Sequence, residues 1–214
     1  HRYIRRQRQM CIRDSIMNAA IVLAAGESLR MGFPKQLAEY KGSTILETTI
    51  DTVSTYFEEA VVVLGHESEI IIEKVDFKSS AILINENWEE GIISSIRTGL
   101  HHLNQNKNFE NVFIFLGDQP SVEGKVIKKL LNTKHDFDEV MIPKYRYKNG
   151  YPVVVPKYFW NKLELITQDN SSDEIDSVFG EFDLINFFES SEFKTKSVNF
   201  NFLKPTDFDE QKDF

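Results

Sequence analysis

Residues 18–35 read N-A-A-I-V-L-A-A-G-E-S-L-R-M-G-F-P-K, an apolar run that passes directly into a loop of small and basic residues. The apolar part, Ala19–Ala24, has the length and composition of a buried β-strand. The small residues Ala24, Ala25 and Gly26 at its end let the backbone come close to a ligand. This stretch therefore predicts the first strand of an α/β fold, followed by a ligand-binding loop.

Downstream of this stretch, strand-like apolar runs alternate with segments of helical periodicity. We expect strands at Ala60–Leu64, Ala81–Ile84, Val112–Leu116, Val140–Ile142 and Pro152–Val155. We expect helices at Thr44–Phe57, at Glu67–Val75, from near Gly91 to beyond Leu103, around Val122–Leu131 and, less regularly, within Trp160–Ser191. Within Glu67–Val75, the run Ile70–Ile72 would also suit a strand. The alternation predicts βαβ units, a mainly parallel Rossmann-like sheet and a three-layer α/β/α sandwich.

Right-handed crossovers place the carboxyl ends of parallel strands along one edge of the sheet, where ligands bind. The loop after the first strand and the turn Gly117–Pro120 after the strand Val112–Leu116 should therefore share an edge. Two segments that are far apart in the sequence can then build one site.

The start of the chain differs from the rest in charge. His1–Ser15 holds five arginines and one acid, and no apolar signal core follows them. Met10–Ser15 resembles translated sequencing-adapter DNA. We expect residues 1–16 to be a non-native N-terminal extension and residues 17–214 to be a single domain; a basic targeting arm is the alternative.

Charge and cysteine content indicate which kinds of binding partner and which cellular compartment to expect. Without the five basic residues and one acid of the extension, the net charge changes from −8 to −12, which disfavours nucleic acid as a partner. The single cysteine, Cys11, lies in the extension, so no disulfide within the chain is expected, which fits a reducing cytoplasm. No apolar run approaches the roughly 20 residues that cross a bilayer. We expect a cytoplasmic protein without a membrane partner.

Two cations stand in the loop after the first strand. Arg30 can grip phosphate oxygens with its planar fork, and Lys35 can act as a mobile point charge. Gly26 and Gly32 are separated by five residues and followed by Phe33, so the loop is not the P-loop G-x-x-x-x-G-K-[ST]. The dinucleotide fingerprint G-x-G-x-x-G is also absent from the sequence. The sequence predicts a triphosphate loop of a different kind; an ordinary glycine-rich turn is the alternative.

The segment Leu23–Lys35, L-A-A-G-x-S-x-R-M-G-x-P-K, resembles the signature of the MobA-like NTP transferases, which have the nucleotide-diphospho-sugar transferase type of fold. Within that family it is most similar to the branch containing molybdenum cofactor cytidylyltransferase. The resemblance extends over roughly Asn18 to Val155. It implies transfer of an NMP from an NTP to a phosphorylated acceptor, with release of pyrophosphate.

The resemblance also implies roles for individual residues. It implies that Asp118 binds Mg²⁺, a cation that takes one or two carboxylates together with phosphates and water, and that Arg30 and Lys35 join it in catalysis by neutralising the triphosphate and the departing pyrophosphate. The expected nucleotide-binding residues are Leu23, Ala24, Ala25, Gly26, Ser28, Arg30, Lys35, Gly65, Ser94 and Ser95. Turn formation is the alternative role of Asp118, and helix capping that of Ser94 and Ser95.

The second half of the chain departs from the family pattern. Tyr151 stands where relatives have a histidine, in G-H-P-V. Asn170–Asp176 keeps acids but loses the G-D-x-G-A-R-like pattern, and Asn201–Asp207 has Asn and Leu where acids are expected. The acceptor is therefore less defined than the nucleotide.

Ala24-Ala25 before Gly26 resembles the branch that uses CTP, so we expect CMP transfer from CTP to molybdenum cofactor (molybdopterin). Transient contact with a molybdoenzyme or its maturation factor would follow from that role. A sugar- or polyol-phosphate nucleotidyltransferase and a non-catalytic nucleotide-binding accessory protein remain the alternatives.

Overall fold

The computed structural model of the chain describes residues 17–28, 31–106, 109–166, 184–190, 193–206 and 208. The strands are β1 (Asn18–Ala24), β2 (Glu39–Tyr40), β3 (Ser43–Thr44), β4 (Ala60–Leu64), β5 (Ala81–Ile84), β6 (Asn111–Leu116), β7 (Glu139–Tyr145), β8 (Lys148–Asn149), β9 (Val153–Pro156) and β10 (Lys194–Phe200). The α-helices are α2 (Ile45–Ser54), α3 (Ser68–Lys74), α4 (Ile92–Asn106), α5 (Gly124–Leu131), α6 (Trp160–Ile166) and α8 (Leu184–Ser190). Short 3₁₀ turns are η1 (Lys35–Leu37), η2 (Trp88–Glu90) and η3 (Lys157–Phe159).

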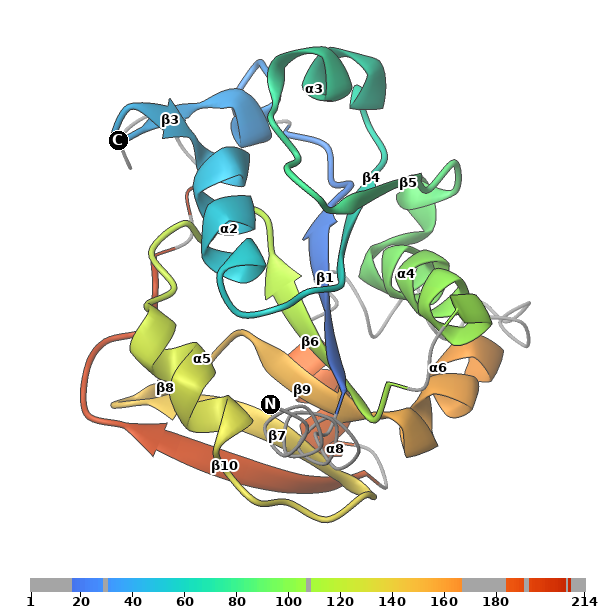
Figure 1. Cartoon of the computed structure of the whole chain (residues 1–214), viewed down its shortest axis with the longest axis vertical. Helices are drawn as coiled ribbons and strands as arrows, with labels where there is room; N and C mark the ends of the chain where they lie inside the picture. Colours follow the sequence, from blue (N-terminus) through green and yellow to red (C-terminus); the bar gives the residue numbers. More distant parts are fainter. Residues whose placement is uncertain are drawn as a thin grey trace, which may run out of the picture.

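An eight-stranded sheet forms the middle of the molecule, in the order β10-β7-β9-β6-β1-β4-β5 with β8 paired to β7 (Figure 1). β1 pairs in parallel with β4 on one side and with β6 on the other. β9 is antiparallel to both β6 and β7, so β7 and β10 again run in the direction of β1. The predicted mainly parallel sheet is confirmed. Because the chain first winds from β1 to β5 and then returns to β6, the strand order reverses between β1 and β6, where ligands bind in such sheets.

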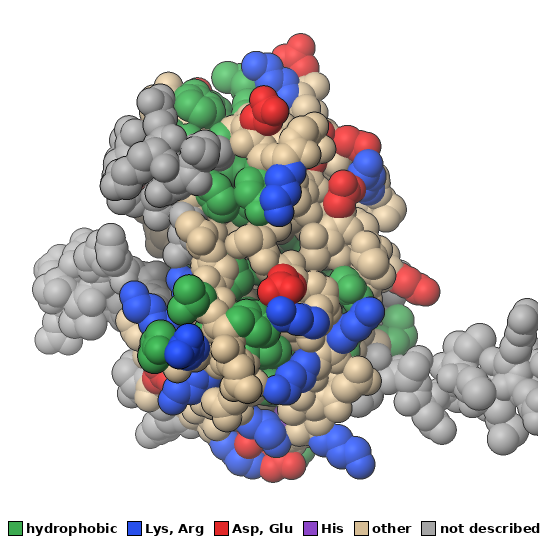
Figure 2. All heavy atoms as spheres, turned by 90° about the vertical axis from the view of Figure 1, so that its left-hand side faces the viewer, with side chains coloured by type: hydrophobic (Ala, Val, Ile, Leu, Met, Phe, Trp, Pro, Cys, Tyr) green, Lys and Arg blue, Asp and Glu red, His purple; other side chains and the backbone are tan. Residues whose placement is uncertain are grey.

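β10 points to the left-hand side of Figure 1, which is the side seen in Figure 2, and β7 runs parallel to it. Lys and Arg side chains gather on the lower half of this face, although the chain as a whole has a net charge of −8.

None of the helices in the described part of the chain combines the length and the apolar composition that a bilayer crossing requires.

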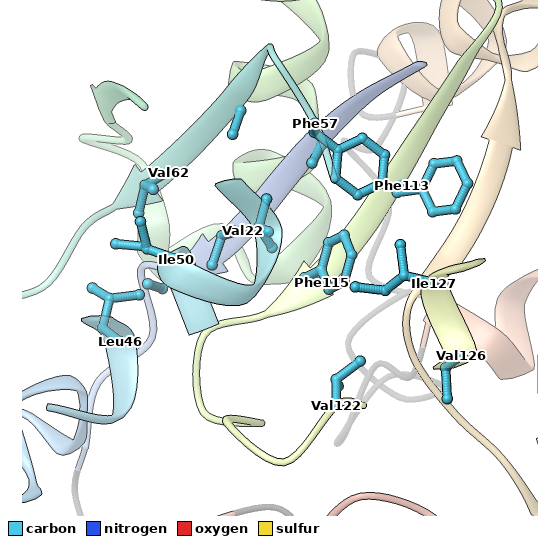
Figure 3. Packing of buried hydrophobic residues seen from close by; sticks show 14 of the residues in the cluster. Val22, Leu46, Ile50, Phe57, Val62, Phe113, Phe115, Val122, Val126 and Ile127 are labelled. Atoms are coloured by element: carbon cyan, nitrogen blue, oxygen red, sulfur yellow. The ribbon is translucent and has the colours of Figure 1, made fainter. Parts of the chain in front are cut away.

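Helices cover both faces of the sheet, and the side chains of β1 alternate between two apolar cores. Ala20, Val22 and Ala24 belong to a first core cluster with α2 and α5. The intervening residues of β1 enter a second core cluster with α4, α6 and α8. Figure 3 shows the first core cluster, in which Phe57 and the β6 residue Phe113 lie close together, with ring centroids 4.9 Å apart. A strand buried on both faces explains the unbroken apolar run in the sequence and confirms the three-layer architecture.

Helix α2 begins at a capping box, in which the side chain of each of two residues accepts a hydrogen bond from the backbone N–H of the other. The Thr44 hydroxyl accepts from the Glu47 N–H at 3.1 Å, and the Glu47 carboxylate accepts from the Thr44 N–H at 2.9 Å. Burial acts to raise the pKa of Glu47, but N–H groups of Thr44 and Asp76 outweigh it, so the pKa lies below 4.5. The predicted helix Thr44–Phe57 is confirmed in a shorter form, with Phe57 buried in the following turn.

The alternative reading of Ile70–Ile72 as a strand is wrong. These residues lie in α3, which buries Ile71 completely and leaves Ile70 and Ile72 exposed. Three consecutive isoleucines can therefore sit on a helix that turns one of them toward the sheet.

The second half of the sheet contains a buried phenol. The Tyr145 hydroxyl donates to the backbone oxygen of Tyr151 at 2.6 Å, and the ring stacks on Phe200 of β10. Burial, with a smaller contribution from Glu123, raises the pKa of Tyr145, so this donor stays protonated.

The expected helical character of Trp160–Ser191 is confirmed at α6 and α8; residues 167–183 lie outside the described residues.

Candidate nucleotide and metal site

A cavity of about 220 Å³ opens at the carboxyl ends of β1 and β6, where the strand order reverses. Its lining residues are Leu23, Ala24, Ala25, Gly26, Lys35, Gln36, Trp88, Gly91, Ile92, Ser95, Leu116, Gly117 and Asp118. A larger hollow of about 520 Å³ lies beside the amino end of β6, and none of the predicted site residues lines it. We place the functional site in the smaller cavity because the predicted residues converge there.

A buried amide holds the loop after β1. The Gln36 side chain is 3% exposed, and its Nε2 donates to the backbone oxygens of Ala24 at 2.9 Å and Gly26 at 3.4 Å. The Ser28 hydroxyl accepts from the Lys35 N–H at 2.8 Å and lies 3.4 Å from Gln36 Oε1. Ser28 and Gln36 thus tie the two ends of the loop together, which presents its backbone to the cavity.

Gln36 is a site residue that sequence reasoning missed. It follows the Pro34-Lys35 end of the loop, and an amide at that position gives no periodic signal. Its role depends on burial against the carbonyl oxygens of Ala24 and Gly26, and that contact exists only in the folded chain.

Lys35 and Asp118 meet across the cavity although they are 83 residues apart in the sequence. Lys35 Nζ lies 2.5 Å from Asp118 Oδ2, with side-chain exposures of 20% and 16%. The Gly117 N–H donates to the Leu23 oxygen at 2.8 Å, which fixes the turn after β6 against β1. The predicted pairing of the loop with the Gly117–Pro120 turn on one edge is therefore present in the structure.

Gly65 stands where the backbone of one strand end passes under an aromatic ring. A Cβ atom at Gly65 would lie 2.5 Å from Trp88 Cβ and 2.7 Å from the Ala25 oxygen, closer than any side chain fits. The His66 ring meets the Trp88 ring edge-on, with centroids 5.0 Å apart. Gly65 thus lies behind the cavity wall and lets Trp88 form part of it.

Ser94 and Ser95 lie at the start of α4, and both accept from Asn85 Nδ2, at 2.8 and 3.0 Å. The Ser94 hydroxyl also lies 2.8 Å from the Gly91 oxygen and is 1% exposed, so it supports the helix start beneath the cavity. Ser95 lines the cavity itself. Among the expected nucleotide-binding residues in the described ranges, Ser28, Gly65 and Ser94 support the walls and the others line them. Arg30 lies outside the described residues.

The donor set at Asp118 fits a hard divalent cation. The carboxylate already holds a positive group, Lys35 Nζ, in the lining of the cavity. Within the described ranges, no group of three or more His, Cys, Asp or Glu side chains is placed to hold a metal ion. A single carboxylate suits Mg²⁺, which keeps water and phosphate oxygens as its other ligands, and suits poorly the ions that need a full protein cage.

The departures in the second half have a partial structural explanation. Tyr151 is 5% exposed, and its side chain belongs to the second core cluster, so it replaces the expected histidine with a packing residue. Asn170–Asp176 and Asp207 lie outside the described residues. Near the carboxyl end of β7, Lys144, Arg146 and Lys148 are exposed. The segment Val140–Leu163 that contains them has five basic residues and no acid.

Comparison with known proteins identifies the family of the chain. The family model described as the MobA-like NTP transferase domain matches residues 20–181. A probable molybdenum cofactor guanylyltransferase of Natranaerobius thermophilus is 29% identical over 126 residues, which cover 58% of this chain and 59% of that protein. The molybdenum cofactor cytidylyltransferase of Escherichia coli is 25% identical over 138 residues, covering 64% and 69%. The match to the first relative thus spans less than two thirds of its length.

The fold is similar to the crystal structure of Rv0371c from Mycobacterium tuberculosis H37Rv, with a TM-score of 0.74, 22% identity, and coverage of 93% of this chain and 95% of that one. A complex of that protein with manganese matches with a TM-score of 0.69, 21% identity, and coverage of 92% and 95%.

Proposed function

Because this chain belongs to the MobA-like NTP transferase family, we propose that it transfers CMP from CTP to a phosphorylated acceptor of the molybdopterin type and releases pyrophosphate. The observation that carries the proposal is the meeting of Lys35 and Asp118 at 2.5 Å beside the loop Ala24–Gly26. This arrangement brings together a cation for phosphate, a carboxylate for a metal and a closely approachable backbone.

The proposed reaction is a direct displacement. An oxygen of the acceptor phosphate forms a bond to the α-phosphorus as the bond from that phosphorus to the α,β-bridging oxygen breaks, and pyrophosphate leaves with the bridging oxygen. No covalent enzyme intermediate is needed, and the ionised acceptor phosphate has no proton to lose. The protein contributes by positioning the reactants and by stabilising negative charge.

The residues that line the cavity have separate roles in the proposed reaction. The Ala24–Gly26 backbone, held by Gln36, receives the nucleotide, and Lys35 neutralises phosphate oxygens and the departing pyrophosphate. Asp118 holds the metal ion, and Mg²⁺ bound there supplies charge neutralisation at the triphosphate. The solved manganese complex of Rv0371c, a protein of similar fold, supports a divalent cation in this proposal.

Two features support CTP as the donor. The small residues Ala24 and Ala25 precede Gly26, as in the branch that uses CTP, and a relative of this chain is a cytidylyltransferase. The guanylyltransferase relative makes GTP the donor to test against it.

The decisive experiment measures acceptor-dependent pyrophosphate release with Mg²⁺, each of the four NTPs and a panel of acceptors. The panel contains molybdopterin, a sugar phosphate and a polyol phosphate. We expect release with CTP and molybdopterin. Turnover with GTP instead of CTP would show that GTP is the donor. Turnover with a sugar or polyol phosphate instead of molybdopterin would show that the acceptor belongs to that class.

Calorimetric titration with each NTP and Mg²⁺ separates the remaining outcomes. Nucleotide binding without turnover on any acceptor would favour the non-catalytic accessory role, and replacing Asp118 with Ala would then leave the cellular function intact. Failure of every NTP to bind would remove the nucleotidyltransferase assignment itself.

A further inference from the structure

A small apolar cluster lies beside the cavity, apart from the two core clusters. It consists of Met31, Ala38, Ile45 and Phe208, with Tyr40 packed against it. Met31 and Phe208 are 4% and 6% exposed. All members except Phe208 come from the segment between the loop after β1 and the start of α2, so Phe208 arrives from the far end of the chain.

The segment after β10, residues 201–206, brings the chain toward this cluster. In Figure 1 it is drawn in red and runs up the left-hand side from β10 toward α2 and β3. It therefore links the last strand of the second half to the nucleotide half, along the side at which β10 ends.

Phe208 contacts the Asp118 turn directly and shares the apolar cluster with Met31 of the Lys35 loop. Its backbone N–H donates to the Asp118 oxygen at 3.3 Å, and its ring meets the Tyr40 ring edge-on, with centroids 5.2 Å apart. Its neighbour in the cluster, Met31, donates its N–H to the Ser28 oxygen at 2.9 Å. Since the Ser28 hydroxyl holds the Lys35 N–H at 2.8 Å, a displaced Met31 would displace the backbone that carries Lys35.

We propose that Phe208 is a positioning residue that fastens the Lys35 loop and the Asp118 turn to each other. It touches neither substrate nor metal; it acts by packing on Met31 and by its hydrogen bond to the Asp118 backbone. The kinetic part of this proposal rests on the proposed function, whereas the mechanical link between the two segments does not.

The mechanical link is tested in the substrate-free protein by hydrogen–deuterium exchange. The variants are Phe208→Ala, Phe208→Leu as the conservative change, and Phe202→Ala as the matched control. Phe202 lies on the same segment but packs near Phe200 and under Lys125, away from the loop. In Phe208→Ala, exchange should rise about tenfold in peptides covering 31–38 and 117–119. Phe208→Leu should restore slow exchange, and Phe202→Ala should leave both peptides unchanged.

The kinetic consequence is measured with the same variants, well below their melting temperatures. Phe208→Ala should lower kcat/KM about 30-fold, because small misplacements of catalytic groups cost large factors in rate. It should also raise the Mg²⁺ concentration for half-maximal activity several-fold, and Phe208→Leu should recover most of both. Phe202→Ala should lose stability without a change in metal dependence.

Unchanged exchange in both peptides of Phe208→Ala would overturn the proposal. So would raised exchange combined with wild-type kcat and metal dependence, because Phe208 would then only stabilise the fold. If the wild-type protein transfers no nucleotide while the exchange pattern holds, the proposed function fails and the link made by Phe208 stands.

Discussion

At the carboxyl ends of β1 and β6, Lys35 and Asp118 are paired at 2.5 Å, whereas near the carboxyl end of β7 the exposed Arg146 and Lys148 form no ion pair with any described residue. Both regions lie on the same edge of the sheet, because β7 runs in the direction of β6. Among the described residues, one end of this edge thus carries a paired cation and carboxylate, and the other carries cations without an ion pair.

Under the proposed function, this difference would let one edge of the sheet receive two anions of different kinds. The paired end suits a triphosphate that arrives with its own metal ion, since both an anion and a cation can be exchanged there. The positive end suits an anion that arrives without a metal, such as an acceptor phosphate. Three variants test this division and a fourth tests the helix cap behind the loop, from the largest expected effect to the smallest.

Replacing Asp118 with Asn should break the paired end most severely. The amide keeps the shape of the carboxylate but loses the charge that holds the metal, so kcat/KM should fall roughly 1000-fold, about 4 kcal/mol of transition-state stabilisation. Steady-state pyrophosphate release measures this loss. Asp76→Asn, at an exposed aspartate paired with Lys78, is the control and should keep wild-type activity. Activity within tenfold of wild type in Asp118→Asn would remove the metal role of Asp118.

Replacing Lys35 with Met should remove the cation of the pair and keep most of the side-chain volume. We expect kcat/KM to fall about 100-fold, about 2.7 kcal/mol, because phosphate charge is no longer neutralised in the transition state. The matched variant is Lys41→Met, which removes an exposed lysine that sits over Tyr40. Equal losses in the two variants would mean that general charge, rather than the position of Lys35, matters.

The double substitution Arg146→Ser with Lys148→Ser tests the positive end. The acceptor KM should rise about fivefold, about 1 kcal/mol, with less dependence on salt, while the CTP dissociation constant stays unchanged. The matched control removes Lys157 and Lys162, which lie over the rings of Trp160 and Phe193. It removes the same amount of positive charge from another part of the same acid-free segment. A higher CTP dissociation constant in the Arg146/Lys148 variant would show that the two ends are not divided as proposed.

The smallest effect is expected at Glu47, which caps α2 behind the loop. Its pKa is lower in the folded chain, so its contribution to stability is present above pH 4.5 and is lost as the pH falls through the lowered pKa. Glu47→Gln should therefore cost at most about 1 kcal/mol at pH 7, since solvent screens this partly exposed group. Urea unfolding at pH 7 and pH 3.5 should show the difference from wild type shrinking in acid. A constant difference would assign the effect to packing.

The nucleotide half could be predicted from the sequence because its signals are local. The strands Ala60–Leu64 and Ala81–Ile84 have the bounds that the sequence predicts, since each is a short apolar run between loops, the first fully buried and the second at the edge of the sheet. The turn at Gly117–Pro120 was predicted from its composition and lies at the end of β6 as expected. Lys35 follows from a motif of fixed spacing, and Asp118 from its place at the end of a predicted strand together with the family resemblance.

The second half gave weaker signals for physical reasons. β10, which sequence reasoning did not predict, reads K-T-K-S-V-N-F, because at the rim of the sheet its polar side chains can stay in solvent. The contacts of Gln36 with Ala24 and of Phe208 with Asp118 are tertiary, so no periodicity announces them. Such contacts become visible only when the packing is known.

The ion pair of Lys35 and Asp118 has a thermodynamic consequence for the order in which ligands gather. A triphosphate alone must compete with Asp118 for Lys35, and a metal ion alone must compete with Lys35 for Asp118. When the nucleotide and the metal ion bind together, the ion pair between Lys35 and Asp118 is replaced by two contacts with the ligands, one from Lys35 to the phosphates and one from Asp118 to the metal ion. Binding of the two ligands is then positively coupled, and by reciprocity each tightens the other by the same factor. In the proposed reaction, the site would thereby discriminate in favour of the metal-loaded nucleotide before any chemistry begins.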